Sequence, residues 1–112
     1  MAMRVPVLVM DSFFKRFRGL MFAWRVEKPL LFVFPQAARH GIHSFFCPAF
    51  DAVFLDAGGV VVGVFRVRHW GPWFAPDKPA TYLIEAAPGF ADRIKMGQSV
   101  RVDVDGAWLD AG

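Results

Sequence analysis

Residues 51–68 read DAVFLDAGGVVVGVFRVR and decide the fold class. Two runs of apolar, β-branched and aromatic residues, 51–55 and 60–68, flank the sequence DAGG at 56–59. Glycine adopts positive φ angles at no steric cost, so two adjacent glycines between such runs favour a tight turn. This stretch therefore predicts a β-hairpin whose second strand is the longer one.

Short apolar runs on both sides of the hairpin indicate a mainly β chain. Several of them are apolar at successive positions, which is typical of strands covered on both faces. Pro6 interrupts the first run and removes a backbone donor, so that strand is expected at a sheet edge. Two amphipathic segments, 13–18 and 90–96, predict short helices. The other predicted strands are 3–10, 30–34, 42–47, 81–86 and 99–104, with brief pairing at 107–109 after a turn at Asp105-Gly106.

The chain shows no internal repeat, low-complexity tract or linker, so residues 1–112 are predicted to form a single domain. Strands with two apolar faces require a closed or covered sheet. We therefore predict a mainly β fold, a single compact barrel or jelly-roll-like sandwich of about seven short strands with two short helices.

Composition excludes several classes of protein. Apolar residues make up 55% and charged residues 21% of the 112 residues, which excludes intrinsic disorder. The single cysteine excludes an intramolecular disulfide and a cysteine-based zinc finger. No apolar stretch approaches the ~20 residues of a membrane-spanning helix, and the first residues lack a secretory signal pattern. With one free thiol and no targeting segment, the chain is expected in the reducing cytoplasm, with no membrane partner.

The charge is unevenly distributed along the chain. Residues 1–50 hold seven Lys/Arg and two acids, a net +5, whereas residues 51–112 hold six and eight, a net −2. A basic half can bind phosphates, so a nucleic-acid-binding protein is one alternative function. The residues that would carry it are Lys15, Arg16, Arg18, Arg25, Lys28 and Arg39.

Five motifs in order give the chain a family resemblance. They are RGLMF at 18–22, LFVF at 31–34, HSFFCP at 43–48 with DAVFLD at 51–56, PW at 72–73, and PATYLIE at 79–85 followed by Gly89. Together they resemble the domain of unknown function 192 (DUF192) family of small bacterial and archaeal proteins, over roughly residues 10–102. The resemblance implies a mostly β domain of barrel or jelly-roll type and assigns no activity. It marks as motif residues Arg18, Gly19, Leu20, Met21, His43, Asp51, Asp56 and Gly89.

No catalytic or metal-binding set is assembled in the sequence. His43 and Cys47 would lie ~13 Å apart along a strand, too far for ligands of one zinc ion. No phosphate-binding glycine loop or serine nucleophile motif is present, and no cofactor is expected. A small hydrolase-type enzyme, the second alternative, would require His43, His69, Cys47 or Glu85 to converge in one pocket. We therefore assign no catalytic residues and no metal ligands.

The best candidate for a ligand site is the end of the long strand and the loop after it. Alternation over 60–68 predicts a face that changes from valines to Arg66 and Arg68, with Trp70 and Trp73 directly after it. Basic groups beside flat rings suit an anionic or carbohydrate-like ligand. Glu85 is expected to be part-buried and to need a partner, which Arg18, Arg66 or Arg68 could provide.

These residues predict a small non-catalytic binding or interaction domain with its site at one end of a β-barrel. The proposed ligand-binding residues are Arg66, Arg68, Trp70, Trp73 and Glu85. The partner is an unknown small molecule or protein, and the chain is expected to be a monomer or weak homodimer.

Overall fold

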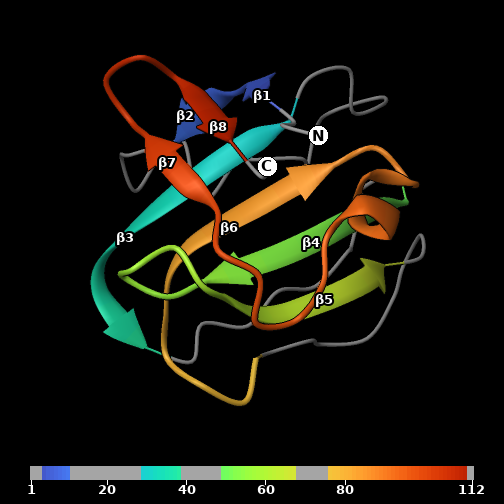
Figure 1. Ribbon diagram of the computed structural model, residues 1–112, viewed down its shortest axis with the longest axis horizontal. Helices are drawn as coiled ribbons and strands as arrows, with labels where there is room; N and C mark the ends of the chain where they lie inside the picture. The colour runs from blue at the N-terminus through green and yellow to red at the C-terminus, as the bar shows by residue number, and fades with distance from the viewer. Residues whose placement is uncertain (1–3, 11–28, 39–48, 68–75, 111–112) are drawn as a thin grey trace.

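The structure, a computed structural model, describes residues 4–10, 29–38, 49–67 and 76–110 (Figure 1). Within these ranges the chain forms eight strands and one short 3-10 helix. The elements are β1 (Arg4–Pro6), β2 (Leu8–Met10), β3 (Leu30–Ala38), β4 (Phe50–Leu55), β5 (Val61–Val67), β6 (Ala80–Ala86), η1 (Phe90–Arg93), β7 (Arg101–Asp103) and β8 (Trp108–Asp110).

The predicted hairpin forms one side of the larger sheet, with β5 as an edge strand. Strands β4 and β5 pair antiparallel, and the five-stranded sheet has the order β2-β3-β6-β4-β5. Strand β4 therefore lies between β5 and β6, and all six of its residues are buried. This interior position explains why the sequence of β4 is a continuous apolar run broken only by Asp51.

The hairpin turn is built by Asp56 and Gly59. The Asp56 carboxylate accepts hydrogen bonds from the N–H groups of Gly58 and Val60, both at 2.9 Å. Gly59 has a φ of 83°, and a Cβ added there would lie 2.2 Å from the Val100 carbonyl oxygen. The predicted turn is thus confirmed, and it requires glycine at position 59 for two reasons, backbone conformation and space.

A register shift in the hairpin corrects the predicted strand face. Phe54 pairs with Gly63 and Leu55 with Val61, which leaves Val62 as the extra residue of a bulge. Val62 packs in one apolar cluster, whereas Val61 and Val64 pack in the other. The prediction that Val64 shares a face with Arg66 is confirmed, whereas the prediction that Val62 shares this face was wrong, because the bulge shifts the alternation by one residue.

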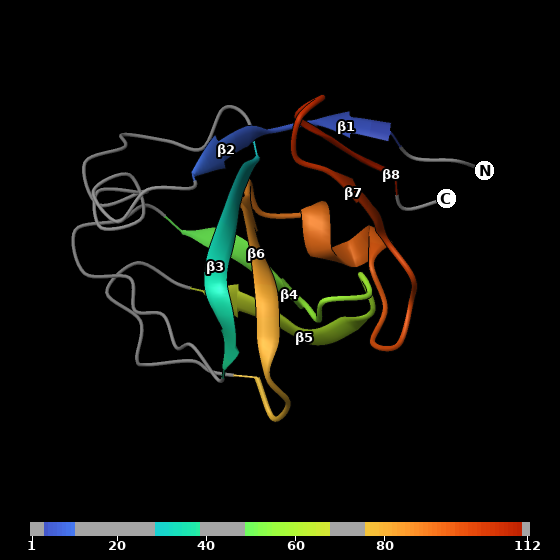
Figure 2. The same ribbon diagram turned by 90° about the vertical axis from the view of Figure 1, so that its left-hand side faces the viewer.

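The two faces of the five-stranded sheet pack in separate apolar clusters. Helix η1 and the three-stranded sheet, of order β1-β8-β7, lie on one side of the larger sheet (Figure 2). The cluster between these layers includes Val7, Leu31, Val53, Ile84, Val100 and Leu109. The cluster on the opposite face includes Leu30, Phe32, Phe50, Phe54 and Leu83. We call the first side of the sheet the η1 face and the second the opposite face.

The first predicted strand divides between the two sheets. Strand β1 pairs antiparallel with β8, and β2 pairs parallel with β3. Between them Val7 is 1% exposed and donates its N–H to the Ala107 carbonyl at 2.9 Å. The edge position predicted from Pro6 is confirmed, since β1 is an edge strand of the smaller sheet.

The last third of the chain is more irregular than predicted. The helix expected at 90–96 spans only residues 90–93, because Ile94 is extended with φ −120° and ψ 137°. Ser99 makes an isolated bridge to Val60, and the strand begins at Arg101. In the turn before β8 the residue with positive φ is Ala107, at 57°.

The predicted fold class is confirmed in its sandwich form. The strands that the structure describes form two packed layers and do not close into a barrel. The strand predicted at 42–47 and the helix predicted at 13–18 lie outside the described residues.

Gly59→Ala tests the turn. The added Cβ would meet the Val100 carbonyl oxygen and force a positive φ on alanine, so we expect a loss of about 2 kcal/mol or more in the free energy of unfolding. Gly58→Ala is the matched control, because its Cβ would find its nearest neighbour at an ordinary 3.5 Å. Urea denaturation of both variants measures the difference. Equal stabilities would contradict the turn geometry.

Candidate functional site

A buried carboxylate organises the η1 face of the sheet. Asp51 is 0% exposed, and its carboxylate accepts hydrogen bonds from the N–H groups of Gly89, at 2.8 Å, and Ala91, at 2.9 Å. Arg66 on the neighbouring strand donates its Nε–H to the same carboxylate at 3.1 Å. Asp51 therefore fixes the segment after β6 against the start of β4, as a buried carboxylate requires.

Arg66 extends this network towards the surface. Its second donor, Nη2, lies 2.8 Å from the Asp92 carboxylate in η1, and its side chain is 56% exposed. The hydrogen bond and charge of Asp51, followed by those of Asp92, raise the pKa of Arg66 further above its ordinary value. Arg66 thus joins strand β5 to η1 through two carboxylates.

The backbone of residues 87–93 makes a tight turn at Gly89. Gly89 has a φ of 105°, and a Cβ added there would find no atom within 4 Å. Phe90 donates its N–H to the Ala87 carbonyl and Asp92 to the Gly89 carbonyl, both at 3.2 Å. The backbone conformation, and not a lack of space, therefore requires glycine here. The absent side chain leaves open space beside the backbone.

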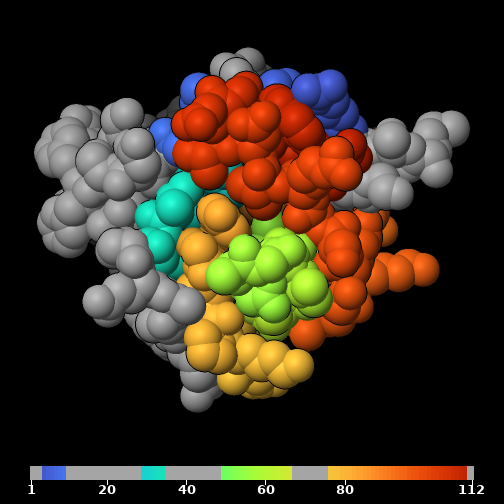
Figure 3. Space-filling model, turned by 60° about the vertical axis from the view of Figure 1, so that its left-hand side comes forward, coloured from blue at the N-terminus to red at the C-terminus, as the bar shows by residue number. Residues whose placement is uncertain are grey.

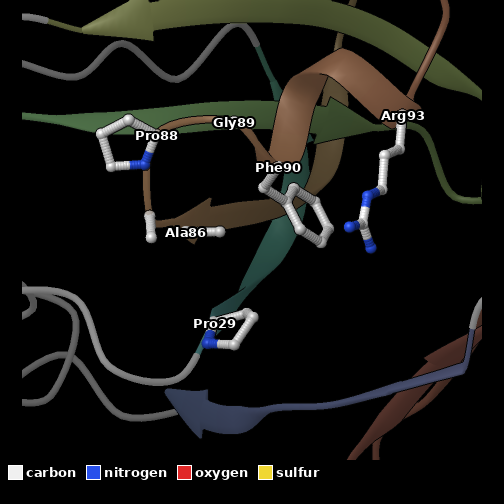
Figure 4. A pocket seen from close by; sticks show the side chains of 7 residues that line it. Pro29, Ala86, Pro88, Gly89, Phe90 and Arg93 are labelled. Atoms are coloured by element: carbon white, nitrogen blue, oxygen red, sulfur yellow. The ribbon is translucent and has the colours of Figure 1, made fainter.

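A pocket of about 310 Å³ lies beside this segment (Figure 4). It is bounded by the end of β6 and η1 on one side and by the residue that precedes β3 on the other. Figure 4 shows the Phe90 ring and the Arg93 guanidinium directed from η1 into the space above Pro29. We call it the η1 pocket; its described lining residues are Pro29, Ala86, Ala87, Pro88, Gly89, Phe90 and Arg93.

Both walls of the η1 pocket are anchored by backbone hydrogen bonds. The Pro29 carbonyl accepts the N–H of Leu8 at 2.9 Å, where the parallel pair β2 and β3 begins. The opposite wall is anchored by the bonds from Gly89 and Ala91 to Asp51. The pocket is therefore held open by the fold, as binding sites commonly are.

A second hollow of about 400 Å³ lies at the tip of the hairpin. Figure 3 shows the turn between β4 and β5 lying between the C-terminal segment and the chain that leads into β6. The hollow is lined by Asp56 and Lys78 and by small residues of the turn. The Asp56 carboxylate already accepts the hydrogen bonds of the turn. Asp56 and Lys78 carry opposite charges, so this hollow is less suited to a charged ligand than the η1 pocket.

The structure does not bring all of the predicted ligand-binding residues together in one site. Arg66 pairs in register with Asp51, whereas Glu85 pairs with Ala52 on the adjacent strand. Neighbouring positions of a strand point to opposite faces, so the five-stranded sheet separates Glu85 from Arg66. Arg68, Trp70 and Trp73 lie outside the described residues, as do the motif residues Arg18, Gly19, Leu20, Met21 and His43.

Glu85 is buried on the opposite face of the sheet. It is 7% exposed beside Leu30 and Ala52, and burial raises its pKa from 4.5 to about 8. The predicted burial is confirmed. Of the three predicted partners, Arg66 bonds to Asp51 and Asp92 instead, while Arg18 and Arg68 lie outside the described residues.

Two other kinds of feature are absent from the described residues. No three His, Cys, Asp or Glu side chains there are grouped to hold a metal ion. Nor does that part of the chain contain a helix with the length and apolar content to cross a membrane. His40, His43 and Cys47 lie outside the described residues.

Comparison with known proteins places the chain among uncharacterised relatives. The family model DUF192, described as Uncharacterized ACR, matches residues 2–104. The chain belongs to the DUF192 family. A UPF0127 protein of Thermococcus sibiricus is 36% identical, with 88% of this chain and 67% of that protein covered. A UPF0127 protein of Pyrococcus furiosus is 32% identical, with 89% and 87% covered.

A solved structure shares the fold of this DUF192 chain. It is a protein of unknown function from Novosphingobium aromaticivorans, with a TM-score of 0.73 and 18% identity over 81% of this chain and 70% of that one. At this identity the likeness concerns the fold alone. The DUF192 motif residues Asp51 and Gly89 gain a physical role here, because they are bonded to each other across 38 positions of sequence.

The η1 pocket of this DUF192 chain was not predicted from the sequence. Most of its lining residues belong to segments that the sequence predicts as a turn and a short helix. Arg93 belongs to none of the sequence motifs. One signal was present: Asp51 is an acid inside an apolar central strand, and such an acid must find donors elsewhere. That signal indicates a contact without identifying the loop that makes it.

Asp51→Ala tests the network. It leaves the N–H groups of Gly89 and Ala91 without their acceptor, so we expect a loss of about 2–4 kcal/mol in the free energy of unfolding. Arg66→Met is the comparison, and its loss should be much smaller because the arginine is largely solvated. Thermal and urea denaturation measure both, and equal losses would show that the ion pair dominates.

Glu85→Gln tests the buried carboxyl group. Between pH 4.5 and about 8 the folded chain retains a proton that the unfolded chain loses, so the free energy of unfolding falls as pH rises. The fall is about 1.4 kcal/mol for each pH unit at most. The glutamine variant should lack this fall, whereas the exposed control Asp77→Asn should keep it. Urea denaturation across this pH range checks the slope; a parallel decline in Glu85→Gln would refute the assignment.

Proposed function

We propose that this DUF192 chain is a small non-catalytic binding domain whose ligand is a small anionic molecule held in the η1 pocket. The observation that carries this proposal is that the Arg93 side chain and the Phe90 ring, both from η1, line the same pocket. Guanidinium groups bind carboxylates and phosphates through paired N–H donors, and aromatic rings provide a flat apolar surface beside them.

The chemistry of the lining supports binding without catalysis. The described lining side chains belong to proline, alanine, glycine, phenylalanine and arginine. None of these is a nucleophile or a general base at neutral pH, which chemical transformation of a ligand would require. Recognition of charge and shape is therefore what these side chains offer.

The network behind the pocket supports a specific site. Asp51 holds the N–H groups on both sides of Phe90, and Arg66 ties Asp92 to the same carboxylate. A pocket whose wall is already ordered loses little conformational entropy when a ligand enters. In this proposal Arg66 is a positioning residue behind the site, and the predicted residues Arg68, Trp70 and Trp73 remain predictions.

Backbone amide NMR tests the proposal. Titration with acetate, benzoate and inorganic phosphate should shift the amide signals of residues 87–94 for at least one anion, while glucose leaves them unchanged. Arg93→Gln should weaken that anion about tenfold, because it removes a charge-assisted hydrogen bond. Arg101→Gln is the matched control, an exposed arginine that does not line the pocket, and should bind like the parent.

Two results would contradict the proposal. The first is the absence of any shift at residues 87–94 with all three anions. The second is an affinity for a single-stranded oligonucleotide that falls steeply with salt and is unaffected by Arg93→Gln, which would favour the alternative function of nucleic-acid binding.

A further inference from the structure

We infer that Asp105 is a site of spontaneous covalent modification, at which a succinimide ring forms with Gly106 and opens to isoaspartate, and that the Asp103 carboxylate is the base for ring closure. The site is the turn that joins β7 to β8, and it is independent of the η1 pocket (Figure 1). The inference follows from the sequence, the exposure of the turn and one short hydrogen bond.

The sequence restricts this reaction to one turn. Isoaspartate forms from asparagine or aspartate, most readily where glycine follows, because glycine has no Cβ to hinder attack by its nitrogen. The chain contains no asparagine, and Asp105 is its one aspartate that is followed by glycine. Asp105 and Gly106 are both exposed, so water reaches the ring that they would form.

A short hydrogen bond places a base on the attacking nitrogen. The Gly106 N–H donates to the Asp103 carboxylate at 2.7 Å, a length typical of bonds to an ionised acceptor. The turn holds this arrangement, because the Ala107 N–H donates to the Val104 carbonyl at 3.3 Å. A general base must lie within hydrogen-bond reach of the proton that it removes, and Asp103 meets this condition at the nitrogen that closes the ring.

The reaction balances as the loss and return of one water molecule. The Gly106 nitrogen gives its proton to Asp103 Oδ1 and forms a bond to Cγ of the protonated Asp105 side chain. The same proton then passes to the Asp105 hydroxyl, which leaves as water and closes the succinimide. Water later opens the ring at either carbonyl carbon: opening at Cγ restores aspartate, and opening at the backbone carbonyl carbon gives isoaspartate.

Isoaspartate would lengthen the main chain of the turn by one methylene group. The turn has contacts that depend on its present length. The Ala107 carbonyl accepts the N–H of the buried Val7 at 2.9 Å, and a Cβ added at Gly106 would lie 2.8 Å from Trp108 Nε1, so the indole already lies against the glycine. We therefore expect the isoaspartate form to melt at a lower temperature than the parent.

Mass spectrometry of aged protein tests the site. The folded protein is incubated in heavy-oxygen water at neutral pH and digested with trypsin in ordinary water. Electron-transfer dissociation of the peptide of residues 102–112 distinguishes isoaspartate from aspartate. Heavy oxygen and isoaspartate should both accumulate at Asp105, while the exposed Asp77, which precedes lysine, should gain neither. Equal labelling of Asp77 and Asp105, or no labelling of Asp105, would overturn the inference.

A substitution at Asp103 separates the base from the hydrogen bond. Asp103→Asn keeps an oxygen that can accept the Gly106 N–H but removes the base, so labelling of Asp105 should slow at least about tenfold. Asp77→Asn is the matched control, the same change at an exposed position outside the turn, and should label Asp105 at the parent rate. Asp105→Glu should give no label in this turn, because glutamate would have to close a larger ring.

The parent chain in urea tests the role of Asp103 without a substitution. Unfolding separates the Asp103 carboxylate from the Gly106 N–H, so labelling of Asp105 should be slower in urea than in the folded protein. Faster labelling in urea, or an unchanged or faster rate in Asp103→Asn, would mean that the hydrogen bond protects the turn, and either result would overturn the role of Asp103 as the base.

Discussion

The carboxylate of Asp51 is buried in an interior strand of an apolar sheet, and its need for hydrogen-bond donors shapes the molecule around it. Arg66 supplies one set of donors from the adjacent strand, but the arginine is largely exposed. The backbone N–H groups of Gly89 and Ala91 supply the rest. They reach the carboxylate only if the chain turns sharply after β6, which the positive φ of Gly89 permits. The turn, η1 and the pocket beside them all follow from this contact.

The parts of the fold that were predicted are those set by local chemistry. The DAGG turn was predictable because an aspartate cap and a glycine at positive φ act within four residues. The edge position of the first strand followed from the missing N–H of Pro6. The bulge at Val62 was not predictable, because residues 60–66 fit regular alternation equally well and the interruption is set by pairing with Leu55.

The candidate site was harder to predict because its residues are distant in sequence. Asp51 is bonded to a residue 38 positions away, and Pro29 reaches the pocket because β3 pairs antiparallel with β6, with Leu30 opposite Glu85. The sequence did indicate that Glu85 would be a part-buried acid. It also offered Arg66 as a partner for Glu85, and the two lie on opposite faces because β4 and β5 align Arg66 with Asp51. Face assignments of this kind depend on register, which a strand pattern alone does not fix.

Asp51 and Glu85 show two physical solutions to the same problem, one on each face of the sheet. Asp51 accepts hydrogen bonds from three groups, and these donors bring η1, Arg66 and Asp92 together. Glu85 lies beside apolar neighbours, and its raised pKa means that burial favours the neutral acid. A neutral carboxyl group recruits no ordered shell of donors, whereas a buried carboxylate does. Within the described residues, the hydrogen-bonded network of Asp51, Arg66 and Asp92 therefore lies on the η1 face. The same face holds the pocket that Arg93 lines. A recognition site for an anion belongs where the fold already orders charge, which is why we place it at η1.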